Sequence, residues 1–142
     1  MNINEMNRKV LDKNQLIKTI FFGFLIWIIP AMVATLLWDV SANKALIDPT
    51  WYNALLGAVW SVNYAIFAYL FFKTVEKDYL TCGLVAGTIW YVINFLLDFL
   101  VVVVILNLGI ETFLPGMLVY VNNLVITIMI GYLLTKKEQK SE

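Results

Sequence analysis

Asp98 is the residue in this chain whose type and position most directly suggest chemistry. It lies in the run from Thr81 to Leu106, TCGLVAGTIWYVINFLLDFLVVVVIL, where Asn94 is the main other polar side chain. A charged side chain at the centre of a membrane helix costs roughly 2.5–3.5 kcal/mol, even on mild insertion scales. Asp98 therefore needs either a partner inside the protein that offsets this cost or a functional role that explains why the charge is kept.

Small and polar residues recur at the three- and four-residue spacing that places side chains on one face of a helix. Four such faces are predicted: Gly23, Trp27, Pro30, Ala34 and Trp38; Gly57, Ser61, Tyr64 and Ala68; Gly83, Gly87, Tyr91, Asn94 and Asp98; and Gly116, Tyr120, Asn123, Thr127 and Gly131. In lipid, small residues let helices approach closely and polar side chains form hydrogen bonds between them. The glycines at 23, 57, 83, 87, 116 and 131 are accordingly assigned to helix packing.

Four apolar runs are long enough to cross a membrane. They cover about residues 19–38, 51–72, 81–106 and 113–134, and about 20 residues span a hydrocarbon core of ~30 Å. The short connections favour antiparallel neighbours. We therefore expect an all-α membrane protein, a bundle of four antiparallel transmembrane helices forming one domain over residues 19–135.

The basic residues predict the orientation of this bundle. Nine of the ten lysines and arginines fall on the side that holds both termini, and only Lys44 falls on the other. Positive charge accumulates in cytoplasmic segments. Both termini are thus expected in the cytoplasm, with the protein in the cell membrane. Residues 1–18 are expected to form a polar or amphipathic leading segment, and residues 136–142 a tail.

Depth in the membrane predicts which polar side chains meet. At ~1.5 Å per residue, Asp98 and Tyr120 both lie about 11–12 Å below the outer ends of their helices. Ser61, Asn94 and Asn123 lie ~15–18 Å down by the same count. We expect Tyr120 to donate to the Asp98 carboxylate, with Asn94 and Asn123 completing the network one turn deeper.

Two further features bear on this interior. Pro30 lacks a backbone N–H, so it is expected to kink the first helix and to free a carbonyl toward the same polar region. Asn63 and Asn122 lie outside the four faces, which predicts a second polar surface and contacts within an oligomer.

Two interpretations of Asp98 stay open. It can be a cation or proton site in a cavity open to the outside, supported by Asn94, Tyr120, Asn123, Ser61 and Tyr64. It can instead be a polar contact that fixes helix register, or one that reaches another subunit. The first interpretation predicts a protein that binds or moves a cation, proton or small solute. The second predicts an accessory subunit without catalytic activity.

Composition excludes several other classes. The chain has no histidine and a single cysteine, Cys82, so it lacks the commonest general base and any disulfide or thiolate metal framework. Its formal net charge is zero, which gives no indication of a nucleic-acid partner. We expect no enzyme activity, cofactor or metal. The expected partners are the lipid bilayer and either further copies of this chain or another membrane protein.

Two patterns suggest a family. Gly23-x-x-x-Trp27-x-x-Pro30 and Gly83-x-x-x-Gly87-x-x-Trp90-x-x-x-Asn94-x-x-x-Asp98 resemble an uncharacterised family of small prokaryotic four-helix integral membrane proteins. The resemblance covers residues 19–135 and implies the four-helix fold, but it carries no activity. Small multidrug exporters fit less well, because they have a glutamate in the first helix and this chain has none there. Quinone-linked thiol oxidases need cysteine pairs, which are absent.

Overall fold

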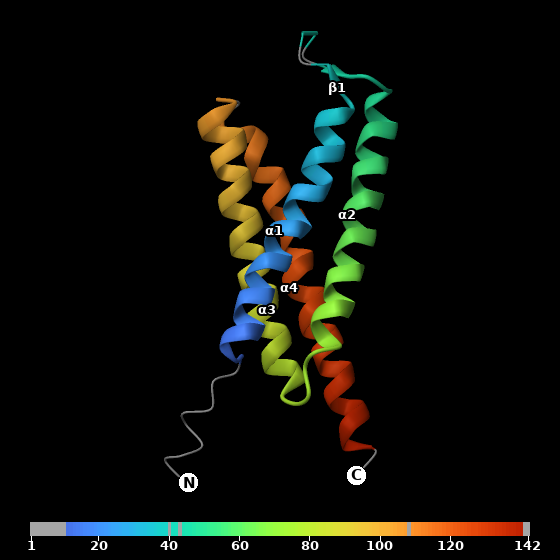
Figure 1. Cartoon of the computed structure of the whole chain (residues 1–142). Coiled ribbons are helices and arrows are strands. Elements are labelled where there is room, and N and C mark those ends of the chain that lie inside the picture. The colour runs from blue at the N-terminus through green and yellow to red at the C-terminus, as the bar shows by residue number, and fades with distance from the viewer. Residues whose placement is uncertain (1–10, 40, 43, 108, 141–142) are drawn as a thin grey trace.

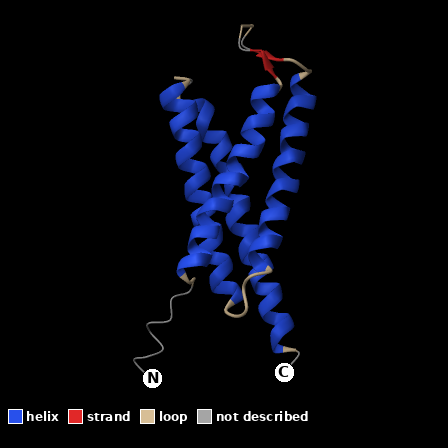
Figure 2. Ribbon diagram, viewed as in Figure 1, coloured by secondary structure: helices blue, strands red, loops and turns tan. Residues whose placement is uncertain are grey.

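Four long helices form the protein (Figure 1). The computed structural model describes residues 11–39, 41–42, 44–107 and 109–140. The helices are α1 (Lys13–Leu36), α2 (Pro49–Phe72), α3 (Tyr79–Asp98), which continues into the π-helix η2 (Phe99–Ile105), and α4 (Ile110–Gln139). Two-residue strands, β1 (Trp38–Asp39) and β2 (Lys44–Ala45), pair antiparallel in the connection between α1 and α2 (Figure 2). The all-α fold is confirmed.

Helix α1 begins earlier than the sequence indicated. Asp12 accepts a hydrogen bond of 2.6 Å from the backbone N–H of Gln15, and the Gln15 side chain accepts one of 3.1 Å from the N–H of Asp12. This capping box starts the helix at Lys13. The expected polar or amphipathic segment 1–18 is thus helical over residues 13–18, where it continues directly into the apolar run. Residues 1–10 of the expected segment lie outside the described residues.

The other helix ends also follow local chemistry. Asp48 caps α2 through the N–H groups of Thr50 and Trp51, and Pro49 occupies the first turn, where its missing N–H is not needed. Helix α4 continues to Gln139, so the segment expected as a tail, 136–142, is helical over residues 136–139.

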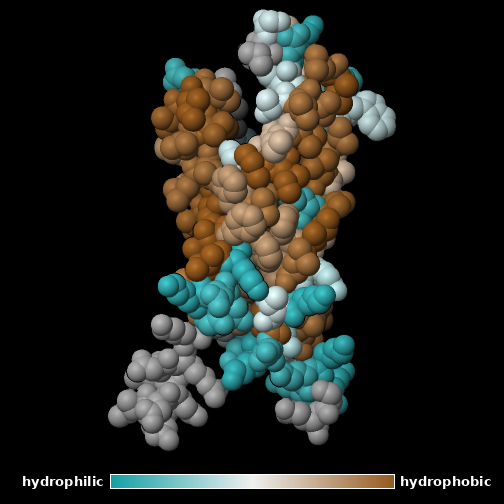
Figure 3. Space-filling view, viewed as in Figure 1, coloured by the Kyte–Doolittle hydropathy of each residue, from teal (hydrophilic) through white to brown (hydrophobic). Residues whose placement is uncertain are grey.

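The four helices suit a bilayer. Each is long and apolar enough to cross a membrane, the spans being Lys13–Leu36, Pro49–Phe72, Tyr79–Ile105 and Phe113–Gln139. Figure 3 shows a broad apolar surface with hydrophilic residues gathered at the two ends. The apolar exterior implies contact with lipid.

The packed core lies in one half of the bundle. We call the end with the start of α1, residues 73–78 and the end of α4 the termini end, and the end with residues 37–48 and 106–109 the hairpin end (Figure 1). Ile26, Tyr64, Phe71, Ala86 and Trp90 are at most 2% exposed. Ile26 lies just past the middle of α1 and the other four in the termini half of their spans, whereas η2 at the hairpin end has no buried residue. The pairs α1/α2 and α3/α4 separate toward the hairpin end, leaving a notch in the surface between them (Figures 1 and 3).

Candidate functional site

The Asp98 carboxylate joins three helices. Its Oδ1 accepts a hydrogen bond of 2.5 Å from the indole Nε1 of Trp27 on α1. Its Oδ2 accepts a hydrogen bond from the hydroxyl of Tyr120 on α4. The contact between Asp98 and Tyr120 that membrane depth predicted is present, and α1 adds a second donor.

Helix α1 reaches Asp98 because it runs alongside α3 in the same direction. Three hydrogen bonds cross this interface at one constant sequence separation of 71 residues. The Trp90 indole donates to the Thr19 carbonyl at 2.8 Å, the Asn94 amide to the Gly23 carbonyl at 3.5 Å, and the Trp27 indole to Asp98. Successive bonds are four residues apart, about one helical turn. The pairing of α1 with α3 therefore fixes the height of Trp27 opposite the carboxylate.

Glycines set the distance between α3 and α4. A Cβ added at Gly83 would lie 2.5 Å from the Thr127 carbonyl oxygen, and one at Gly87 would overlap the Thr127 hydroxyl. One added at Gly131 would lie 2.5 Å from the carbonyl oxygen of Tyr79. Only glycine lets the two backbones approach this closely. The close approach brings Tyr120 within reach of Asp98.

The third span changes its helix type at Asp98. The residues that follow, Phe99–Ile105, form the π-helix η2 instead of continuing the α-helix expected to Leu106. They read FLVVVVI, and a run of β-branched side chains is crowded against the preceding turn of an α-helix. π-Turns widen the helix and recur at functional sites. Asp98 is thus the last residue of the regular helix.

The environment of Asp98 leaves its charge uncompensated within the described part of the chain. Both hydrogen bonds come from neutral groups, and no described lysine forms a hydrogen bond or ion pair with Asp98. The side chain is half-buried, at the last residue of α3. A bound proton or small cation would neutralise this charge.

Asn94 and Asn123 do not join one network. The buried Asn94 amide donates to the Trp90 carbonyl at 2.8 Å and to α1, so it serves the α1–α3 interface. The Asn123 side chain is fully buried on α4, and neither its Nδ2 nor its Oδ1 has a hydrogen-bond partner among the described residues. The expected completion of the Asp98 network by these two amides is wrong.

Tyr64 lies in the buried interior, as its helix face predicted, whereas Ser61 does not. Tyr64 is buried, and its hydroxyl donates at 2.6 Å to the backbone carbonyl of Asn123, which ties α2 to α4. Ser61 is exposed, and its hydroxyl donates a hydrogen bond of 2.8 Å to the Gly57 carbonyl of its own helix. Ser61 therefore lies outside the polar interior.

Two of the glycines assigned to packing, Gly57 and Gly116, have no packing neighbour in the described part of the chain. Nothing lies within 4 Å of a Cβ placed at Gly57 or at Gly116. The assignment holds for Gly23, whose added Cβ would lie 2.9 Å from the Trp90 ring, as well as for Gly83, Gly87 and Gly131.

Pro30 and Asn63 are linked. The helical donor for the Ile26 carbonyl would be the N–H of residue 30, which proline lacks. Asn63 on α2 donates its amide to that carbonyl at 3.1 Å, and to the Leu25 carbonyl at 3.4 Å. Asn63 is buried, so the prediction that it belongs to an outward polar surface is wrong. Asn122, by contrast, is exposed.

Sequence reasoning missed Trp27 as a member of the site. Its position on the small-and-polar face of the first span was recognised, but its indole N–H was not counted as a donor. The available signal was the spacing: Gly23 and Trp27 on α1 repeat the four-residue interval of Asn94 and Asp98 on α3.

Comparison with known proteins identifies no family. No family model matches the sequence, and no curated protein or solved structure matches it. The four apolar helices place the chain in a broad class, the small integral membrane proteins with four membrane-spanning helices. The resemblance to a four-helix membrane family is supported only to that extent.

Proposed function

We propose that this protein binds a proton or a small monovalent cation at Asp98 and passes it between the membrane interior and the hairpin end. The observation that carries the proposal is the pairing of Asp98 with two neutral donors only, Trp27 and Tyr120. Neutral donors orient a carboxylate but leave its net charge, and that charge is costly inside a bilayer. A bound proton or cation would neutralise it.

The proposed access is from the hairpin end. The helix pairs diverge there (Figure 1), and Asp98 is half-buried instead of sealed in the core. With nine of the ten basic residues assigned to the other side, the positive-inside bias places the termini end in the cytoplasm. The site would then face the outside of the cell membrane.

The test measures binding and flux with the same variants. In proteoliposomes, Asp98→Asn is expected to abolish the pH- or Na⁺/K⁺-driven flux of the wild type. The matched control is Glu111→Gln, which neutralises an exposed carboxylate in the first turn of α4. In parallel, the indole emission of Trp27 is expected to respond to pH or cation titration in the wild type but not in Asp98→Asn. If Asp98→Asn leaves both flux and emission responses unchanged, the proposal is wrong.

An accessory subunit is the second candidate. It is favoured by Gly57, an exposed glycine in the middle of a lipid-facing helix with open space around it, because small residues admit a neighbouring helix. In this case Asp98 would serve only to hold α1, α3 and α4 together. Cross-linking from Gly57→Cys in native membranes is expected to capture a stoichiometric second membrane protein. Recovery of the uncross-linked chain alone would count against this candidate.

A further inference from the structure

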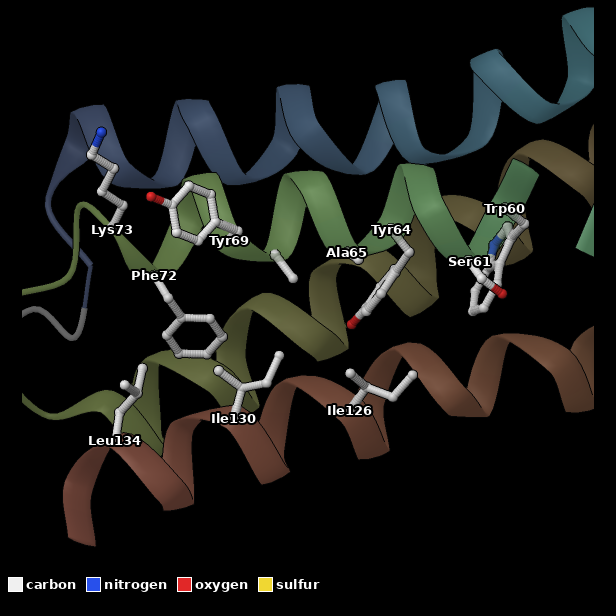
Figure 4. Close-up of a pocket in the computed structure, with 11 residues that line it drawn as sticks. Trp60, Ser61, Tyr64, Ala65, Tyr69, Phe72, Lys73, Ile126, Ile130 and Leu134 are labelled. Atoms are coloured by element: carbon white, nitrogen blue, oxygen red, sulfur yellow. The ribbon is translucent and has the colours of Figure 1, made fainter. Parts of the chain in front are cut away.

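A groove runs between α2 and α4, and Asp98 is not among the residues that line it. Of the neighbouring helix pairs, α2 and α4 pack least closely. The space between them has a volume of about 500 Å³. Figure 4 shows Phe72, Ile126, Ile130 and Leu134 lining it, with Lys73 at one end and Trp60 with Ser61 at the other. Several lining residues, Ser61 and Ile126 among them, are exposed, so the groove opens toward lipid.

The lining is apolar along its length and polar at its ends. The Lys73 side chain is exposed at the termini end. At the opposite end the Trp60 ring stacks on Tyr64, with ring centroids 5.3 Å apart. The buried Nε1 of Trp60 has no hydrogen-bond partner in the described part of the chain. The lining therefore suits an elongated apolar molecule that carries an anionic group at the Lys73 end.

The length of the groove distinguishes between occupants. From Lys73 to Trp60 along α2 is about 20 Å at ~1.5 Å per residue. A single leaflet contributes about half of the ~30 Å hydrocarbon core. The groove thus accommodates a chain that enters from one leaflet and ends near the midplane. A transmembrane helix of a partner would need a complementary surface over the full ~30 Å.

Charge favours an anionic headgroup at the open end. Described lysines gather at the termini end and include Lys13, Lys18, Lys73, Lys77, Lys136 and Lys137, whereas Lys44 lies at the hairpin end. Basic residues next to a membrane attract anionic lipids, and each contributes about 1 kcal/mol near the surface. Lys73 is the lysine that lines the groove itself.

We propose that this groove is a binding site for one anionic phospholipid of the leaflet at the termini end, with an acyl chain lying between α2 and α4 and its headgroup at Lys73. The site is independent of Asp98. The bound acyl chain would pack between α2 and α4, the pair of helices that contact each other least. Failure of either proposal leaves the other untouched, since Asp98 does not line the groove.

Brominated lipids give a direct test, because bromine quenches tryptophan emission on contact. Delipidated protein in detergent is titrated with brominated phosphatidylglycerol or brominated phosphatidylcholine. The Trp60 contribution is obtained by subtracting the signal of Trp60→Phe. Saturable quenching of Trp60 is expected at lower amounts of phosphatidylglycerol than of phosphatidylcholine. Lys73→Gln is expected to weaken the anionic lipid about fivefold, and the control Lys77→Gln, in the same connection but outside the groove, is expected to weaken it less.

A second pair of variants tests the groove itself. Ala65→Phe fills it from α2 and is expected to remove the Trp60 quenching, whereas Ala58→Phe, on an exposed part of α2 outside the groove, is expected to leave it intact. Thermal melts check that both variants fold. Equal quenching by the two lipids would show that the groove contacts ordinary boundary lipid without preference for an anionic headgroup, and it would overturn the proposal. Trp60 emission that neither lipid quenches would overturn it as well.

Discussion

Asn63 supplies the hydrogen bond that Pro30 withholds from the Ile26 carbonyl. The proline stays inside an unbroken α1, and the donor that replaces its N–H comes from α2 at 3.1 Å. An unpaired carbonyl in the membrane interior is destabilising, so the two residues form one structural unit although they lie on different helices.

This unit is tested with a double-mutant cycle. Asn63→Leu removes the donor, and we expect it to lower the free energy of unfolding by about 1–2 kcal/mol, the cost of leaving a buried acceptor unpaired. Pro30→Ala restores the N–H of residue 30, so the same Asn63→Leu change should cost clearly less in that background. SDS-induced unfolding in bicelles measures the four free energies. Equal costs in both backgrounds would show that Asn63 acts independently of Pro30.

The glycines of the α3–α4 interface give a second prediction. Gly131→Ala would place its Cβ 2.5 Å from a backbone carbonyl of Tyr79, which can move only with its helix. We expect a loss of stability of about 1–3 kcal/mol, as for other overpacked contacts. Gly57→Ala is the control, because its Cβ meets open space. It should be neutral or stabilise by up to about 1 kcal/mol through helix propensity. The contrast is read from the unfolding midpoints, and similar shifts for both variants would contradict the packing role.

The sequence predicted the helices and the level of the polar site for physical reasons that act locally. Four long apolar runs have few alternatives to spanning a membrane, and counting residues from the helix ends placed Asp98 opposite Tyr120. Glycines four residues apart on α3 and a third on α4 correctly indicated a close interface. Each of these inferences depends on spacing along one helix or on depth alone.

Lateral arrangement was harder to predict. Which neighbour a polar face meets depends on how the helices are ordered around the bundle, and every helix offered a similar face. Asn94 was therefore paired with α4, whereas it contacts α1. Asn63 was assigned to an outer surface because its role depends on a carbonyl freed by Pro30 in a different helix. Gly57 and Gly116 illustrate the same limit, since a small residue on a helix does not specify that another helix of the same chain covers it.

Asn123 supplies a third prediction. Its side chain is fully buried and both of its polar atoms lack partners among the described residues. Replacing an unpaired buried amide with an apolar group of the same shape can be neutral or stabilising. We expect Asn123→Leu to leave unchanged or raise the melting temperature of the protein in detergent, because the backbone carbonyl that binds Tyr64 is retained. A marked fall in melting temperature would instead indicate that the amide is bound in the native state.

Asp39 gives a prediction about pH in the connection between α1 and α2. The Ser41 hydroxyl donates to its Oδ1 at 2.6 Å and the N–H of Ala42 at 3.0 Å. These hydrogen bonds favour the ionised form and lower the pKa of Asp39 below its ordinary value of 3.8. A lowered folded-state pKa means that the stabilisation is present above the unfolded-state pKa and is lost as pH falls through the lower folded-state value. Carbon NMR of the Asp39 carboxyl should show a titration midpoint below 3.8, and Ser41→Ala should move that midpoint upward. If Ser41→Ala leaves the titration midpoint unchanged, the Ser41 hydrogen bond is not the cause of the lowered pKa of Asp39.

The donors to Asp98 provide the last prediction, which separates their contribution to stability from that of the carboxylate. Trp27→Phe and Tyr120→Phe each remove one donor and keep most of the ring that packs around it. Hydrogen bonds in membrane helices average ~0.6 kcal/mol and reach ~1.7 kcal/mol, and bonds to charged groups lie toward the stronger end. We expect each variant to lower the free energy of unfolding by about 1–2 kcal/mol.

In an Asp98→Leu background, the acceptor is absent and the same two changes should cost little, because their effect depends on the carboxylate. Unfolding of the wild type, the three single variants and the two doubles measures both coupling energies. Since Trp27 reaches Asp98 from α1 and Tyr120 reaches it from α4, coupling at both would mean that Asp98 holds the two helix pairs together at the level where they begin to separate. Neutralising Asp98 with a bound proton or cation would then weaken both hydrogen bonds together, which would couple occupancy of the site to the opening between the pairs. Coupling at Tyr120 alone would confine the role of Asp98 to the α3–α4 hairpin.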